Sequence, residues 1–296
     1  ANRGLLLEAG EDFPPGSEPQ EIRDTFAGTA HGNPRFTWRG QTVAFGPRPG
    51  NAPDGRRRVR YAQGRVIGGG SSVNGMISIR GLPTDYDGWA TRGAAGWGWD
   101  DVLPYFRKSE GNVRGADDLH GDTGPLQVAE QTGPRPISRA FVDAAAEVQI
   151  RRNDDFNGPE QEGAGLYQVT QFWRDGRRGE RCSAAAAYLH PAMDRPNLKV
   201  ITGAHVTRVL FDGTRATGVS WRKGGAEQQA TARAEVIVCG GAFNSPQLLM
   251  LSGIGPGEHL RSRGIEVRKD LPGVGQNLQD HLDYIYAAKT RDTDVL

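Results

Sequence analysis

The sequence predicts an α/β fold, α+β overall, on three observations. Residues 5–7 and 236–239 are short apolar runs with the length of buried strands. After the second run, two glycines at 240–241 predict a sharp turn, and Ser-Pro at 245–246 has the hydroxyl cap and proline of a helix start. Residues 204–211 alternate apolar and polar side chains, as a half-buried strand does. A strand, a glycine turn and a helix in succession can place a helix N-terminus against a ligand, although an ordinary strand–helix unit has the same pattern.

Further strands are predicted around this alternating stretch. Residues 198–202 predict a strand just before it. An Asp-Gly turn at 212–213 follows it, and residues 217–222 then predict an antiparallel hairpin partner. The helix that starts at 245 is expected to end at Ser252, where the next residue is a glycine.

The middle of the chain is predicted to hold two helices and a loop. Residues 100–108 have Asp100 as a cap and apolar side chains on one face, and residues 138–148 repeat apolar side chains at helical spacing. Residues 111–133 are rich in glycine and aspartate and predict a loop. Aromatic residues gather nearby, and core packing explains them better than a substrate cage does: Trp89, Trp97, Trp99, Tyr105 and Phe106.

Composition and charge argue against several functional classes. The 296 residues carry 36 basic and 35 acidic side chains, a net charge of +1, so nucleic-acid binding is not expected. The arginine run 56–58 is typical of a solvated loop. Two cysteines, Cys182 and Cys239, make neither a disulfide framework nor a metal-ligand cluster, and Cys239 is expected to pack in a buried strand. No apolar run approaches the ~20 residues of a membrane span, and no signal peptide is visible.

The most informative stretch is glycine-rich. Residues 64–77 read G-R-V-I-G-G-G-S-S-V-N-G-M-I. Glycine lets the backbone come into contact with a flat or anionic ligand, because no Cβ stands in the way. Backbone amides, together with Ser71, Ser72 and Asn74, could then donate hydrogen bonds to phosphate or carbonyl oxygens. Taken alone, such a run also fits a tight loop with no ligand.

This stretch and residues 241–255, G-A-F-N-S-P-Q-L-L-M-L-S-G-I-G, occur in an order that resembles the glucose-methanol-choline (GMC) oxidoreductases, in particular their bacterial branch similar to choline and alcohol dehydrogenases. One residue departs from the family pattern, because Ser78 stands where an aromatic residue or alanine is usual. The resemblance extends along nearly the whole chain through L-L-L-E-A-G at 5–10, D-Y-D-G-W-A at 85–90, G-W-G-W-D-D-V-L-P-Y-F at 96–106, D-D-F-N-G at 154–158, R-C-S-A-A-A-A-Y-L at 181–189 and G-V-G-Q-N-L-Q-D-H at 273–281.

The resemblance implies an FAD site and names its residues. Glu8, at the end of the first apolar run, is expected to bind the adenosine ribose, and Val206 is expected to offer backbone groups to the adenine. The flavin ring is expected to contact Val66, Gly68, Gly69, Asn74, Gly75, Met76 and Ile77. Some relatives tether FAD through a histidine at the position of Val73, and because valine cannot form that bond, FAD is expected to be non-covalent. No metal site is expected.

The resemblance also implies an organisation. Residues 1–85 and 191–283 are expected to form an incomplete Rossmann-like FAD-binding domain that lacks the G-x-G-x-x-G loop of its first strand–helix unit. Residues 86–190 are expected to belong to a substrate-binding domain of antiparallel sheet and helices, and residues 284–296 to begin a strand of it. The catalytic histidine is expected beyond this fragment, so no catalytic residue is assigned, and a structural role is expected for His281.

The implied activity is FAD-dependent oxidation of an alcohol to an aldehyde or ketone, with hydride transfer to flavin N5. The expected partners are a small alcohol and an electron acceptor, either oxygen or a quinone or another carrier. The fragment alone is expected to be inactive, and the location is expected to be cytoplasmic or peripheral to the inner membrane. Two alternatives stay open: a lyase that cleaves cyanohydrins on the same scaffold, and a truncated relative without catalysis.

Overall fold

The computed structural model describes residues 3–24, 26–47, 56–281, 283–285 and 289. These residues form two compact units, and each is treated by itself. Residues 1–11 and 199–289 make up unit 1, and residues 12–198 make up unit 2.

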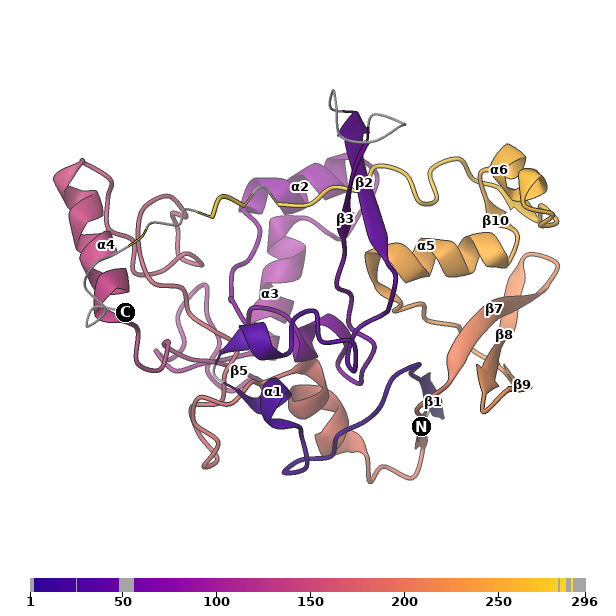
Figure 1. The fold of residues 1–296 in the computed structure, drawn as a ribbon, viewed down its shortest axis with the longest axis horizontal. Helices are drawn as coiled ribbons and strands as arrows, with labels where there is room; N and C mark the ends of the chain where they lie inside the picture. The colour runs from indigo at the N-terminus through magenta and orange to yellow at the C-terminus, as the bar shows by residue number, and fades with distance from the viewer. Residues whose placement is uncertain (1–2, 25, 48–55, 282, 286–288, 290–296) are drawn as a thin grey trace. The chain divides into compact units, whose positions relative to one another are not determined.

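Unit 1 is built on small sheets and one long helix (Figure 1). Strands β7, β8 and β9 form an antiparallel sheet in that order, β1 pairs with β6, and β10 pairs with β11 in parallel. The elements are β1 (Gly4–Leu7), β6 (Leu198–Ile201), β7 (His205–Asp212), β8 (Arg215–Lys223), β9 (Ala226–Thr231), α5 (Gly241–Leu251), β10 (Ile254–Gly255), α6 (Gly257–Ser262) and β11 (Lys269–Asp270).

A buried serine joins α5 to the sheet of unit 1. The hydroxyl of Ser252 accepts a hydrogen bond from the amide of Val209 in β7 (2.9 Å) and donates one to the carbonyl of Leu248 (2.6 Å). Ser252 and Val209 are both buried, so each polar group on them needs such a partner. The end of the helix is therefore fixed against the middle of the strand.

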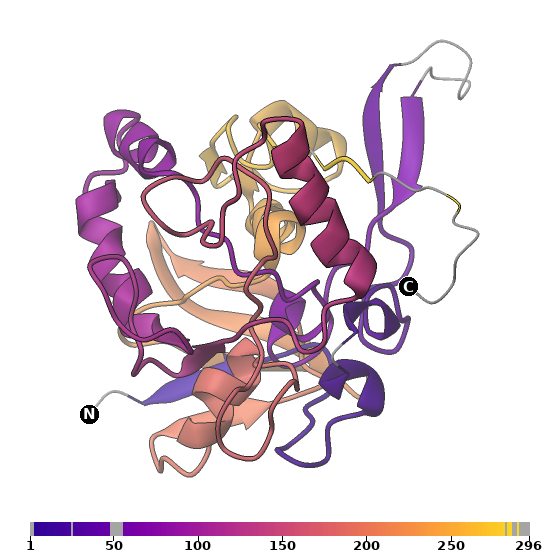
Figure 2. The same ribbon diagram turned by 90° about the vertical axis from the view of Figure 1, so that its left-hand side faces the viewer.

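Unit 2 contains most of the helices (Figure 1). Figure 2 shows the antiparallel pair β2–β3 standing apart from α2, α3 and α4. The elements are α1 (Gln20–Arg23), a 3-10 turn (Ala27–Thr29), β2 (Thr42–Pro47), β3 (Arg56–Arg60), a 3-10 turn (Gly69–Ser72), α2 (Pro83–Thr91), α3 (Trp99–Ser109), β4 (Glu110–Asn112), β5 (Leu126–Val128), α4 (Pro136–Glu147), a π-helical turn (Ala185–Leu189) and a 3-10 turn (His190–Ala192).

One hydrophobic core cluster of unit 2 lies directly under the glycine-rich loop. Val66 and Val73, from that loop, pack with Phe36 and Ile22 in one buried cluster. Phe13 meets the ring of Phe36 edge to face, with ring centroids 5.7 Å apart. The loop is thus tied to the core by its two valines.

Aromatic side chains join α2 to α3 in unit 2. Tyr86 is buried and lies 5.2 Å from Trp89, 5.7 Å from Trp99 and 5.6 Å from Phe106, measured between ring centroids. Tyr105, in α3, has an exposed side chain. The core packing predicted for the aromatic set at 89–106 is therefore wrong: none of its five side chains is buried, and Trp89, Trp97 and Tyr105 are exposed, so the rings lie at the surface of the contact between α2 and α3.

Several predicted elements are confirmed with shifts of a few residues. Helices α3 and α4 correspond to the predicted 100–108 and 138–148, and β6, β7 and β8 to the strands predicted after residue 197. The turn between β7 and β8 has Gly213 at φ 56°, and Ser252 is the C-cap of α5, followed by Gly253 at φ 88°. The residues within each of these elements are therefore sufficient to predict it.

The predicted strand at 236–239 is wrong. These residues lie in no strand, Ile237 is 72% exposed and Cys239 is also exposed. An apolar run becomes a strand only when a neighbouring strand supplies its hydrogen bonds, and no strand of the described residues pairs with this one.

Four smaller predictions are corrected by local structure. Helix α5 begins at Gly241, and Pro246 lies inside it. The carboxylate of Asp101, not Asp100, accepts the amide of Gly98 at the start of α3 (3.1 Å). The arginine run 56–58 lies in β3, and the predicted loop 111–133 contains β5 and most of β4, which pair in parallel.

Replacing Phe36 tests the core under the loop. Phe36 is 1% exposed, so Phe36→Ala should leave a cavity and lower the free energy of unfolding by about 3–5 kcal/mol. Phe141, in α4, is 68% exposed, and Phe141→Ala should change it by no more than about 0.5 kcal/mol. Chemical denaturation of both variants measures the difference, and equal losses would contradict this description of the core.

Candidate functional site

The glycine-rich loop folds back on itself through glycines that have no room for a side chain. Gly68 has φ 88°, and a Cβ on it would lie 2.4 Å from the hydroxyl oxygen of Ser72 and 3.2 Å from Ala185. A Cβ on Gly64 would lie 2.5 Å from the carbonyl oxygen of Gly69. The inner side of the loop is therefore closed.

The other side of the same loop is open. A Cβ on Gly69 or Gly70 would meet no heavy atom within 4 Å, and one on Gly75 would only touch Ile77 at 4.0 Å. Asn74 is exposed next to Gly75. A loop that is closed on one face and lined with bare backbone on the other fits a flat ligand that must approach the main chain.

Two of the predicted flavin-contact residues turn their side chains inward. Val66 is 1% exposed and belongs to the core cluster, and Met76 is also buried. The carbonyl of Met76, whose φ is 62°, accepts a hydrogen bond from the amide of Thr170 (2.7 Å). These two residues can reach a ligand only through their backbone. Val73, the position of the tether in some relatives, is buried in the same core cluster as Val66.

Arg181 supports the loop from behind and was missed by sequence reasoning. Its Nη1 donates to the carbonyls of Ser71 (3.2 Å) and Asn74 (2.8 Å) and to the Asn74 side-chain oxygen (3.0 Å). Its Nε donates to the carbonyl of Ile22 (3.0 Å). The available signal was an arginine beside an apolar, alanine-rich stretch, but nothing in the sequence shows that its side chain is buried.

Backbone hydrogen bonds through Thr170 connect the end of the loop to the segment that carries Arg181. The amide of Thr170 donates to the carbonyl of Met76, and the amide of Cys182 donates to the carbonyl of Thr170 (2.9 Å). Ser78, which follows the loop, donates its amide to the carbonyl of Gln168 (2.9 Å). The loop thus ends against a segment that is itself paired with residues 180–182.

A buried ion pair fixes the chain just beyond the loop. Nη2 of Arg80 lies 2.6 Å from the carboxylate of Glu110, and both side chains are almost fully buried. Asn157 accepts the amide of Arg80 (2.7 Å) and donates to the carbonyl of Ser78 (2.9 Å). Because both charges are paired and hydrogen-bonded, the pair can be accommodated in the interior.

The two predicted adenosine residues lie together in unit 1. Glu8 follows β1, and its carbonyl accepts a hydrogen bond from the amide of Ala204 (2.8 Å), two residues before Val206. The carboxylate of Glu8 accepts the amide of Gly10 (2.7 Å). The structure therefore brings Glu8 and Val206 together in one unit and the seven predicted flavin-contact residues together in the other.

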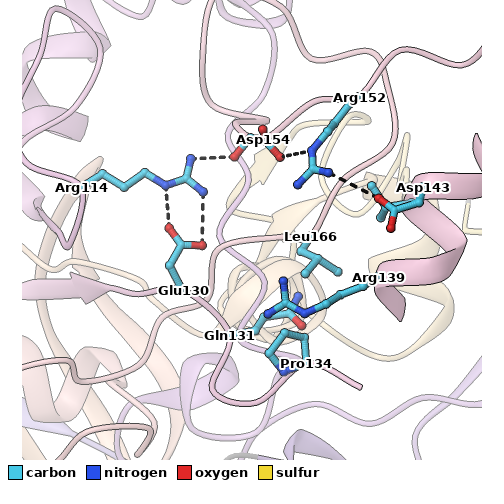
Figure 3. A pocket seen from close by; sticks show the side chains of 10 residues that line it. Arg114, Glu130, Gln131, Pro134, Arg139, Asp143, Arg152, Asp154 and Leu166 are labelled. Atoms are coloured by element: carbon cyan, nitrogen blue, oxygen red, sulfur yellow. Dashed lines mark hydrogen bonds and ion pairs between the residues drawn. The ribbon is translucent and has the colours of Figure 1, made fainter. Parts of the chain in front are cut away.

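A cavity lies elsewhere in unit 2 (Figure 3). It has a volume of about 380 Å³, and no predicted site residue lines it. Arg114 makes a forked pair with Glu130 (2.6 and 3.2 Å), and Arg152 lies 2.9 Å from Asp154 and 3.5 Å from Asp143. Arg139 also lines the cavity, so charges of both signs face it and the lining points to no particular ligand.

Within the described residues, neither a cluster of metal-ligating side chains nor a membrane-spanning helix occurs. No group of three or more His, Cys, Asp or Glu side chains in this part of the chain is placed to hold a metal ion. No helix there combines the length and apolar content that crossing a membrane requires.

Comparison with known proteins identifies the family. The profile of the GMC oxidoreductases matches residues 25–283. The chain belongs to the GMC oxidoreductase family. It is 44% identical to the mitochondrial choline dehydrogenase of Homo sapiens over 98% of this chain and 48% of that protein. It is 46% identical to the oxygen-dependent choline dehydrogenase of Sinorhizobium fredii over 78% of this chain and 41% of that protein. The chain thus spans about half the length of the curated relatives it matches, or less.

Solved structures confirm the predicted fold class. An FAD-dependent oxidoreductase from Chaetomium thermophilum matches with a TM-score of 0.81 and 31% identity, over 94% of this chain and 48% of that one. Pyridoxine 4-oxidase from Mesorbium loti matches with a TM-score of 0.79 and 32% identity, over 91% of this chain and 50% of that one. The α/β class, as part of a larger flavoenzyme fold, therefore holds.

Two glycine variants test the closed and open faces of the loop. Gly68→Ala should lower stability, because the left-handed conformation alone costs about 1–2 kcal/mol and the new Cβ clashes with Ser72. Gly70→Ala should leave the melting temperature unchanged and weaken ligand binding, because its Cβ would enter only the open side. Thermal melting and flavin titration measure the two effects. Equal thermal loss in both variants would contradict the two-sided description.

Proposed function

We propose that this chain is the FAD-binding part, with part of the substrate domain, of an enzyme that oxidises an alcohol to an aldehyde or ketone. The observation that carries the proposal is the loop at 64–77, closed on its inner face and open on its outer face. Membership of the GMC family supports it, as do relatives named as choline dehydrogenases and a structural neighbour named as an FAD-dependent oxidoreductase.

The residues of this chain would hold the cofactor in two places. Glu8 would accept a hydrogen bond from the adenosine ribose, and Val206 would offer its backbone to the adenine. Asn74 would face the flavin ring with its side-chain amide. The backbone of the other loop residues would lie along the ring: Val66, Gly68, Gly69, Gly75, Met76 and Ile77. When bound, FAD would supply the hydride acceptor at N5.

The loop would bind FAD without a covalent bond. The side chain of Val73 is apolar and buried in the core cluster, so it neither reacts with the flavin nor faces the open side. Hydrogen bonds and packing would then provide all the affinity. Loop amides and Asn74 would stabilise electron density on the ring, which favours hydride acceptance.

The proposal extends to domains and partners. Residues 1–85 and 191–283 would belong to the FAD-binding domain and residues 86–190 to the substrate domain. Most of residues 284–296, expected to begin a strand of the latter, lie outside the described residues. The substrate would be a small alcohol, and choline is the first candidate because relatives are named for it. The acceptor would be oxygen or a quinone or another carrier, and the enzyme would work in the cytoplasm or at the inner membrane. No residue of this chain is proposed as the catalytic base.

Anaerobic reduction tests the activity. The protein, expressed at its full natural length with bound FAD, should lose its visible flavin absorption when choline or another small alcohol is added without oxygen. Denaturation with acid should leave the flavin in the supernatant. Flavin that no alcohol reduces, together with cleavage of a cyanohydrin, would indicate a lyase instead. Flavin that stays on the acid-precipitated protein would contradict non-covalent binding.

A further inference from the structure

Arg181 is buried without an ionic partner. Its side chain is 3% exposed, and no carboxylate of the described residues lies within ion-pair distance of it. Burial lowers the pKa of its guanidinium to about 10, so it remains protonated at neutral pH. Its Nη2 has no hydrogen-bond partner in the same part of the chain. A buried cation without a carboxylate partner is costly, and the hydrogen bonds that Arg181 donates to the loop and to Ile22 have to offset that cost.

Nearby arginines are placed differently. Arg177 lies 2.8 Å from Glu18 and 2.8 Å from Glu180, and Arg23 also pairs with Glu180. Burial acts to raise the pKa of Glu180, but hydrogen bonds from Arg23 and Arg177 outweigh it and hold that pKa below its ordinary value. These two arginines are explained by their carboxylate. Arg181 instead donates its hydrogen bonds to uncharged oxygens, and three of its four acceptors belong to the glycine-rich loop.

The contacts of Arg181 fix which way the amide of Asn74 faces. The side-chain oxygen of Asn74 accepts hydrogen bonds from Arg181 Nη1 (3.0 Å) and from the amide of Met76 (3.1 Å). Both partners can only donate, so this atom must be the oxygen and the NH2 group must occupy the other end. Asn74 is exposed and lies next to Gly75 on the open side of the loop. The network thus leaves the NH2 group available as a donor.

The chain segment around Arg181 holds the loop at a second point. The amide of Ala184 donates to the hydroxyl of Ser71 (2.8 Å), and that hydroxyl donates to the carbonyl of Gly68 (2.6 Å). Ser71 is therefore contacted from residues 181 and 184 at once. Because Gly68 carries the left-handed turn, this contact couples the segment to the backbone on which the open face depends.

We propose that Arg181 is a positioning residue, which holds Asn74 so that its side-chain NH2 group donates a hydrogen bond to an acceptor atom of the flavin ring. The inference rests on the proposed function, because it requires FAD to lie on the open side of the loop. It adds to that function a residue that does not touch the ligand and acts through Asn74, while its contact with the Ser71 carbonyl supports the same loop.

Three variants at full natural length test this role. Asn74→Asp keeps an oxygen for Arg181 and Met76 but replaces the NH2 donor with a second oxygen. Arg181→Met removes one of the two hydrogen bonds that orient the Asn74 side chain, and the one from the Met76 amide remains. Arg181→Lys keeps the charge but cannot fork between Ile22 and the loop. Arg177→Met is the matched control, because Arg177 is also partly buried and paired but does not touch the loop.

Flavin affinity and reduction potential are the readouts. Asn74→Asp and Arg181→Met should each weaken FAD binding to the deflavinated protein by about tenfold or more and lower the reduction potential of the bound flavin. Arg181→Lys should show a smaller change in the same direction. In the double variant Asn74→Asp/Arg181→Met, the loss of FAD affinity should be smaller than the product of the fold-losses in the two single variants. Both substitutions act on the same hydrogen bond from Asn74 to the flavin, so their effects should not multiply. Arg177→Met should lower the melting temperature and leave affinity and potential unchanged.

The outcomes separate the inference from the function on which it rests. Wild-type affinity and potential in Arg181→Met and Arg181→Lys, with only a thermal loss like that of Arg177→Met, would overturn the positioning role and leave the proposed function intact. If Arg181→Met does not fold, Asn74→Asp and Arg181→Lys decide by the same readouts. A wild-type protein that binds no FAD would overturn the proposed function and the inference together.

Discussion

The backbone turn at Gly68 is the constraint on which the candidate site depends. Its φ of 88° is one that L side chains rarely adopt, and a Cβ there would overlap the hydroxyl of Ser72. The turn brings the residues after it into a 3-10 helix and leaves Gly69 and Gly70 with bare backbone on the opposite face. A side chain at Gly68 would change both faces of the loop at once.

The loop keeps this shape because it is held from the inside on both flanks. Val66 and Val73 bury their side chains beside Phe36, and Met76 buries its own between the loop and residues 170–171. Arg181 then satisfies loop carbonyls that face the interior, where an unpaired carbonyl would be costly. The buried side chains of Val66 and Met76 thus hold the loop in place, and in the proposed site only the backbone of these two residues would face the cofactor.

Sequence predicted well those features whose cause is local. The glycine run, the β7–β8 hairpin with its Asp-Gly turn and the C-cap of α5 at Ser252 all depend on residues close in the chain. The prediction of a strand at 236–239 was wrong because a strand needs a neighbouring strand to pair with, and the apolar run alone does not show whether such a neighbour exists. Arg181 was missed for a related reason, since it lies more than a hundred residues after the loop it supports. Arginine side chains are mostly exposed in proteins, and only the tertiary structure reveals that this one is buried.

Hydrogen exchange tests most directly whether residues 64–77 contact the flavin. The full-length protein would be labelled with and without FAD, and the amides of 64–77 would be compared with those of α4, residues 136–147. The account predicts that FAD slows exchange in the loop, at 68–77 above all, and leaves α4 unchanged. FAD that binds with equal exchange at 68–77 in both states would contradict it, because the cofactor would then lie elsewhere.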